Sequence, residues 1–137
     1  MACKLIVFAL GVSATAIGFG FSAALAQTAP SPFTDAQVQA GRGAYASYCA
    51  SCHGADLNGT GHFPALIGKA FVSEWGGRTT HDLYEKIRDT MPFCAGGTLD
   101  DNSYAAIVAL ILQTNGAVAG SQPFAADTTL TISTIVK

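Results

Sequence analysis

Charged residues are scarce in this chain of 137 residues: Lys, Arg, Asp and Glu make up 12% of it, and the formal net charge at pH 7 is −2. The basic residues are scattered and form no run, which argues against a nucleic-acid-binding surface. No internal repeat is present, which argues against solenoid and propeller folds. The length is that of one small domain with a modest core.

Methionine, histidine and cysteine are also rare, with two, three and four copies. Yet two of the cysteines and one histidine stand together in Cys49-Ala50-Ser51-Cys52-His53. Two thiols at this spacing with an adjacent imidazole are typical of covalent haem attachment, in which each sulfur adds to a vinyl group. The histidine is then the proximal iron ligand. We therefore predict one haem c, bound covalently by Cys49 and Cys52, with its iron bound by His53.

Two other readings of the cysteine pair are open. It could be a thioredoxin-like redox couple, or half of a zinc site completed by His53, His62 or Cys94. A zinc ribbon needs a second close ligand pair, and none follows residue 53. A thioredoxin-like couple needs a βαβ context, whereas the flanking sequence favours helices.

The first 26 residues have the pattern of an export signal. Lys4 precedes an apolar stretch that begins at Leu5, and Ala24-Leu25-Ala26 is a small-x-small cleavage site. We predict that residues 1–26 are a cleaved signal peptide and that the protein is periplasmic. The alternative is an uncleaved membrane anchor, because residues 5–26 are long enough to span a bilayer. Gly, Ser and Thr residues dilute that stretch and favour cleavage.

Cleavage would remove Cys3 and leave an odd number of cysteines. If Cys49 and Cys52 hold haem, Cys94 is left without an assigned role. It is then a spare thiol, or a residue that pairs or packs at a partner surface.

After a linker at 27–33, the sequence predicts helices and no sheet. Thr34 and Gln37 form a capping box, and apolar residues then recur at helical intervals as far as Cys52, until Gly54 ends the helix. Glycines make the stretch after it a loop. We therefore expect the first helix to deliver the two cysteines on its apolar face.

Two more helices complete the predicted all-α domain over residues 34–116. One runs from 81 to about 90, is capped by Thr79 or Thr80 and is ended by Pro92. The other follows Leu99 and ends at 115–116. Residues 117–137 form a C-terminal tail that is rich in β-branched residues near its end, which favours an extended segment on the domain or on a partner.

Met91 is the candidate for the second axial iron ligand. The other methionine is the initiator, and a residue before proline is pushed out of the helical region, which would free the Met91 sulfur. A thioether ligand favours ferrous iron and raises the potential relative to two histidines. The alternatives are His62 or His81 as the ligand, with Met91 packing in the core.

Four segments together resemble a class I cytochrome c: Cys49–His53, Pro64–Gly68, Thr90–Pro92 and a last helix that ends at Asn115-Gly116. The resemblance covers about residues 35–116. It implies three to five helices wrapped around one covalently bound haem, with the first and last helices crossing and an extended C-terminal tail.

Particular residue roles follow from the same resemblance. It places Gly41 and Tyr45 at the helix crossing and implies that the Pro64 carbonyl accepts a hydrogen bond from His53. Trp75 and Arg78 are expected near the haem propionates, with packing in a surface loop as the alternative.

A narrower resemblance is to the cytochromes that accompany pyrroloquinoline-quinone alcohol dehydrogenases. It rests on the segments 71–75, 82–84 and 97–104 and on the tail. Two features depart from the pattern: Leu110 stands where many relatives have an aromatic residue at the crossing, and Cys94 lies outside the usual motif.

The predicted function is electron transfer rather than catalysis. We expect an exported carrier of one electron at a time, between a periplasmic dehydrogenase as donor and an oxidase or another cytochrome of the respiratory chain as acceptor. Through such partners it would work near a membrane. The alternatives are a haem subunit inside a quinoprotein dehydrogenase complex, and a haem catalyst or gas sensor with an open iron site.

Overall fold

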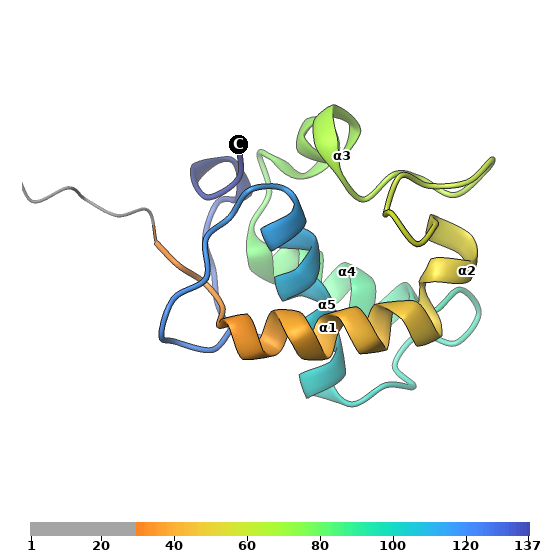
Figure 1. Cartoon of the computed structure of the whole chain (residues 1–137), viewed down its shortest axis with the longest axis horizontal. Coiled ribbons are helices and arrows are strands. Elements are labelled where there is room, and N and C mark those ends of the chain that lie inside the picture. The colour runs from red at the N-terminus through yellow and green to blue at the C-terminus, as the bar shows by residue number, and fades with distance from the viewer. Residues whose placement is uncertain (1–29) are drawn as a thin grey trace, which may run out of the picture.

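The computed structural model describes residues 30–137, so the predicted signal peptide lies outside the described residues. Within this range the chain folds into five α-helices and one 3₁₀ helix (Figure 1). The only β-pairing there consists of two isolated bridges, so the predicted all-α fold class is confirmed. The elements are α1 (Asp35–Tyr48), α2 (Ala50–His53), α3 (Gly68–Trp75), α4 (Thr80–Thr90), α5 (Asp101–Thr114) and η1 (Ile132–Thr134).

The helices begin where the sequence places polar caps. Thr34 and Thr79 each form a complete capping box, and the Asp100 carboxylate accepts from the backbone of Ser103 at 3.0 Å. At the other end of α4, Met91 has extended backbone angles, φ −125° and ψ 148°. The residue before Pro92 therefore leaves the helix as predicted.

The structure differs from the sequence prediction at two places in the helix order. The first predicted helix is divided at Cys49, which separates α1 from α2. The other difference is α3, which the sequence did not predict. This helix has only eight residues, starts at a glycine with φ 72°, and has no side-chain cap from Ile67, so it carries none of the usual start signals.

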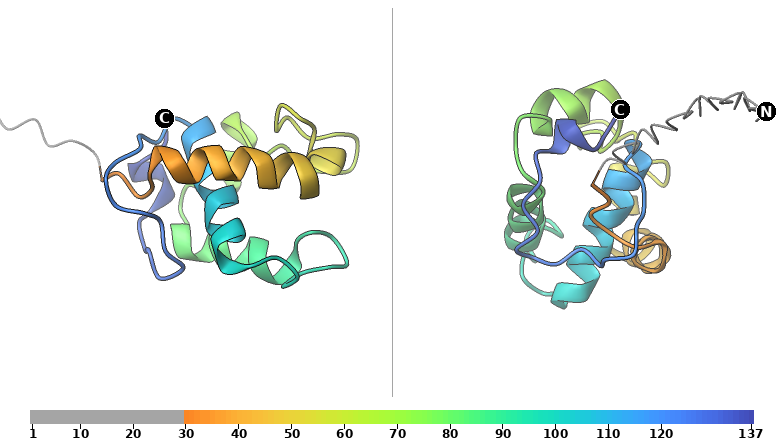
Figure 2. Two further views of the ribbon diagram at one scale, coloured as in Figure 1. Left: turned by 60° about the horizontal axis from the view of Figure 1, so that its bottom comes forward. Right: turned by 90° about the vertical axis from the view of Figure 1, so that its left-hand side faces the viewer.

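The core is built around the crossing of α1 and α5, which Figure 1 and Figure 2 show from different sides. The residues of α5 from Tyr104 to Leu112 are all buried. A Cβ atom on Gly41 of α1 would lie 2.1 Å from the Ala106 carbonyl oxygen of α5, so only glycine allows the two backbones to approach this closely.

The C-terminal segment packs along the start of α1 and α4. The Gln37 side chain accepts from the backbone N–H of Phe124 at 2.7 Å and donates to its carbonyl at 2.9 Å. The fully buried Thr80 hydroxyl donates to the Thr128 carbonyl at 2.6 Å. Phe33, which the sequence analysis assigns to the linker, is also fully buried, and its carbonyl accepts from Gly120 at 2.7 Å. Both flanks of the predicted domain therefore contribute to the folded unit.

A search for membrane-spanning helices among residues 30–137 finds none of sufficient length and hydrophobicity.

We predict that Gly41→Ala destabilises the protein by about 2 kcal/mol or more, because the added methyl group forces α1 away from α5. Gly43→Ala on the same helix is the matched control, since nothing lies within 4 Å of its Cβ position. The control should be neutral or stabilising by about 0.5–1 kcal/mol, because alanine favours the helix. Denaturant unfolding of both variants measures the difference, and equal stabilities would contradict the close crossing.

Candidate functional site

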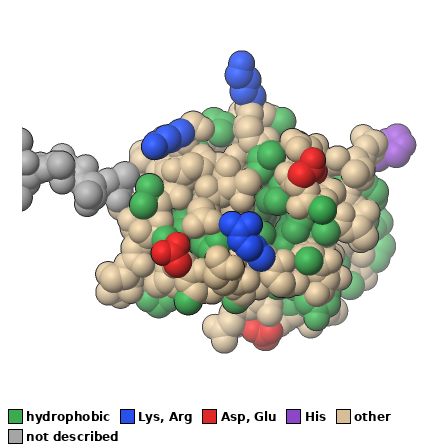
Figure 3. Space-filling view, in the orientation of Figure 1, with side chains coloured by type: hydrophobic (Ala, Val, Ile, Leu, Met, Phe, Trp, Pro, Cys, Tyr) green, Lys and Arg blue, Asp and Glu red, His purple; other side chains and the backbone are tan. Residues whose placement is uncertain are grey.

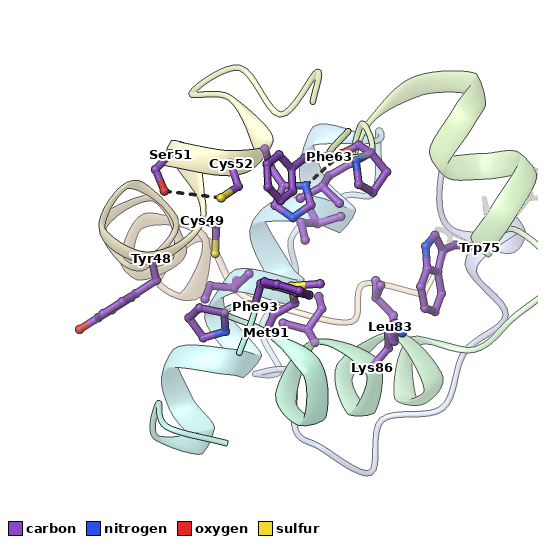
Figure 4. Close-up of a pocket in the computed structure, with 17 residues that line it drawn as sticks. Tyr48, Cys49, Ser51, Cys52, Phe63, Trp75, Leu83, Lys86, Met91 and Phe93 are labelled. Atoms are coloured by element: carbon purple, nitrogen blue, oxygen red, sulfur yellow. Dashed lines mark hydrogen bonds between the residues drawn. The ribbon is translucent and has the colours of Figure 1, made fainter. Parts of the chain in front are cut away.

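A cavity of about 430 Å³ opens between the helices (Figure 4). This size lies in the range of sites that hold small molecules and cofactors. All five α-helices contribute to its mostly apolar wall. The lining residues are Tyr48, Cys49, Ser51, Cys52, His53, Phe63, Pro64, Leu66, Trp75, Leu83, Lys86, Ile87, Met91, Pro92, Phe93, Ile107 and Ile111.

His53 is held in the cavity wall through one ring nitrogen. Its Nδ1–H donates to the Pro64 carbonyl at 2.9 Å, and the ring packs edge-on against Phe63 with the ring centroids 6.1 Å apart. With Nδ1 as the donor, the neutral imidazole presents the electron pair of Nε2, the form in which an imidazole binds metal. Nε2 has no hydrogen-bond partner among the described residues.

The loop that supplies Pro64 is tied to the histidine segment by its backbone. The N–H of Gly59 donates to the His53 carbonyl at 2.8 Å, and the Tyr45 hydroxyl of α1 donates to the Gly54 carbonyl at 2.7 Å. Burial raises the pKa of Tyr45 to about 12, so this hydroxyl remains a donor at neutral pH. The chain is therefore fixed on both sides of the imidazole.

Cys49 and Cys52 lie half-buried at the same end of the cavity, and neither forms a disulfide. Burial, with a smaller contribution from the neighbouring Cys52, raises the pKa of the Cys49 thiol to about 11. Cys94 is exposed and does not line the cavity. The structure thus brings together the two cysteines of the motif and leaves the third outside.

Of the three candidates for a second axial ligand, only Met91 lines the cavity. His62 is exposed in the loop between α2 and α3. His81 is occupied elsewhere, since its Nδ1–H donates to the Ala126 carbonyl at 2.6 Å and Nε2 lies 3.5 Å from Glu85.

The two residues expected near the propionates are placed differently. Trp75 lines the cavity on the side away from the cysteines (Figure 4). Arg78 does not line it: its guanidinium lies 4.9 Å from the centroid of the Trp75 ring and pairs with Glu74 at 3.0 Å. Arg78 therefore supports the position of Trp75 by packing.

Several contributors to the site were missed by the sequence analysis. Lys86 is the one lysine or arginine among the residues that line the cavity, and a long cation there suits an acidic substituent of a ligand. The position of Lys86 one turn after Leu83 on the same helix could have identified it as a lining residue.

Asn115, predicted only as a helix end, is buried. Its side chain donates to the Leu66 carbonyl and accepts from the Gly68 N–H, both at 2.9 Å. No sequence pattern predicts this contact between Asn115 and residues 66–68.

Three large apolar side chains lie at the exposed part of the cavity wall, where Ser51 and Lys86 are also exposed. Tyr48, Phe63 and Phe93 line the cavity and are also exposed, with Phe93 the most accessible at 75%. On the face in Figure 3, charged side chains are few and stand apart from one another.

The alternative of a zinc site has no support in residues 30–137. No group of three His, Cys, Asp or Glu side chains lies close enough together there to hold a metal ion. The residues present do fit a haem. The wall is apolar, one imidazole nitrogen is free to bind iron, and a thioether and two thiols line the same cavity.

Comparison with known families supports this assignment. Residues 36–111, from α1 to α5, match the family described as cytochrome c oxidase, cbb3-type, subunit III. The chain belongs to this family of c-type cytochromes. Membership implies a haem c cofactor and a role in electron transfer rather than catalysis.

A solved structure gives a second comparison. The cytochrome is similar to a chain in the crystal structure of the sulfane dehydrogenase SoxCD from Paracoccus pantotrophus, with a TM-score of 0.55 and 28% sequence identity. The similarity covers 93% of this chain and 68% of that one. No curated protein matches the sequence.

Proposed function

We propose that this protein is an exported cytochrome c with one haem that carries single electrons between a periplasmic dehydrogenase and the respiratory chain. The observation that supports this most strongly is that Met91 and His53 line one apolar cavity together with Cys49 and Cys52. When bound there, haem c supplies an iron that alternates between the ferric and ferrous states.

In this proposal each residue has a separate task. Cys49 and Cys52 hold the haem through thioether bonds, and His53 Nε2 and the Met91 sulfur bind the iron. The Pro64 carbonyl, which accepts from His53 Nδ1 at 2.9 Å, orients the imidazole and makes it more basic. The Met91 thioether favours the ferrous state.

Two protein ligands favour a carrier over a catalyst or gas sensor. If His53 and Met91 both bound the iron of a haem held here, they would leave no iron position open to a substrate. The wall is mostly apolar, His53 is the last residue of α2 and Met91 directly follows α4, so ordered backbone would hold both ligands in place. Little rearrangement then accompanies electron transfer.

Partner proteins would dock over the exposed part of the cavity wall, where the large apolar side chains of Tyr48, Phe63 and Phe93 are accessible. A small contact of this kind suits the transient complexes of electron carriers. The export signal in residues 1–26 supports a periplasmic location, with an uncleaved anchor as the alternative.

The second candidate function is a haem subunit inside a dehydrogenase complex. The similarity to a chain of the sulfane dehydrogenase SoxCD over 93% of this sequence favours it. Association with a pyrroloquinoline-quinone alcohol dehydrogenase stays a prediction from the sequence. Copurification from the native periplasm distinguishes a free carrier from a subunit of either kind of dehydrogenase.

We predict that the haem remains with the chain in denaturing electrophoresis after expression in a host that matures c-type cytochromes. A Cys49→Ser, Cys52→Ser double variant should lose the haem-stained band, because no thioether bond remains. Cys94→Ser is the matched control and should keep it, since Cys94 lies outside the cavity. A colourless wild-type band would refute covalent attachment.

We predict a low-spin ferric spectrum for the wild type, with a weak sulfur-to-iron band in the far red. Met91→Ala should abolish this band, lower the reduction potential and allow carbon monoxide to bind the ferrous protein. The control His62→Ala should keep the wild-type spectrum, because His62 is exposed and outside the cavity. A high-spin wild type that binds carbon monoxide readily would instead favour the catalyst or sensor.

A further inference from the structure

The hydroxyl of Tyr104 lies behind the Met91 side of the cavity. Tyr104 belongs to the first turn of α5, is only 1% exposed and does not line the cavity itself. Its hydroxyl donates to the Met91 carbonyl at 3.0 Å and accepts from the Leu99 N–H at 3.3 Å. One buried oxygen therefore joins both ends of the 91–99 loop to α5.

Both polar groups of the Met91 backbone are thus held by helices. The Met91 N–H donates to the Ile87 carbonyl of α4 at 2.9 Å, while its carbonyl accepts from Tyr104 of α5. The side chain of Met91 has three rotatable bonds and no preferred partner of its own. Its direction into the cavity therefore depends on how firmly its backbone is placed.

Tyr104 is well suited to place it. A buried aromatic ring has few rotatable bonds, and its helix packs against α1 at Gly41. α1 is followed directly by Cys49 and by α2, which ends at His53. The Tyr104 hydroxyl therefore links the Met91 backbone, through α5, to the helix that positions the cysteines and the histidine of the cavity.

We infer that Tyr104 is a positioning residue for the Met91 thioether: its hydroxyl holds the Met91 carbonyl, so that the sulfur would be kept within reach of the iron of a haem bound in the cavity. This inference rests on the proposed function. The variant Tyr104→Phe keeps the ring and removes only the hydroxyl. It should therefore make it easier for a competing ligand to displace Met91 from the iron.

The test measures imidazole binding to the ferric holoprotein, because imidazole must displace Met91 to reach the iron. Tyr104→Phe should bind imidazole about tenfold more tightly than the wild type, the size of effect expected when the hydrogen bond to the Met91 carbonyl is lost together with the longer one from Leu99. The reduction potential of Tyr104→Phe should also fall, because methionine ligation weakens.

Tyr84→Phe is the matched control. Tyr84 is as buried as Tyr104, and its hydroxyl donates to the Asp101 carboxylate at 3.1 Å instead of binding the Met91 loop. This control should bind imidazole as the wild type does.

The outcomes separate the two claims. A wild type without the far-red band overturns Met91 ligation and this inference with it. A wild type with the band, together with equal imidazole affinities for Tyr104→Phe and Tyr84→Phe, overturns only the role of Tyr104.

A measurement on the unaltered protein covers the case in which Tyr104→Phe does not fold. Hydrogen exchange of the ferrous holoprotein should show a slowly exchanging Leu99 amide, because that N–H donates to the buried hydroxyl. Exchange of Leu99 at the rate of an unprotected loop amide would overturn the inference.

Discussion

The close crossing of α1 and α5 is the contact on which the rest of the structure depends. Gly41 lets the backbone of α1 approach the Ala106 carbonyl of α5, and both helices lead directly to the cavity. α1 continues into Cys49 and His53, while α5 carries the tyrosine that binds the Met91 carbonyl. A change at the crossing would therefore move both walls of the site relative to each other.

The rest of the fold supplies rigidity around that crossing. The C-terminal segment joins the start of α1 to the start of α4 through Gln37 and Thr80, and Asn115 ties the end of α5 to the loop before α3. These contacts use buried or partly buried polar groups whose hydrogen bonds are satisfied, which favours a single arrangement. For an electron carrier this matters because the iron ligands must stay in place while the charge changes.

Local signals in the sequence predicted the parts of the fold that local chemistry determines. Capping residues located the starts of α1 and α4, Pro92 located the end of α4, and the Cys49–His53 motif with Met91 located the candidate ligands. What the sequence did not predict depends on tertiary contacts. α3 has no cap, the Tyr104 hydroxyl binds a backbone carbonyl 13 residues away along the chain, and the packing of Phe33 depends on a segment beyond α5.

The central claim is that Met91 and His53 together close the coordination of one haem iron. The most direct test is a proton spectrum of the ferrous holoprotein with its methionine methyl groups labelled with carbon-13. Met91 is the only methionine besides the initiator, so its signal is readily assigned. A sulfur bound to the iron places this methyl group over the porphyrin face, and the ring current should shift its resonance far upfield. A methyl resonance at the position of an ordinary methionine would contradict the claim.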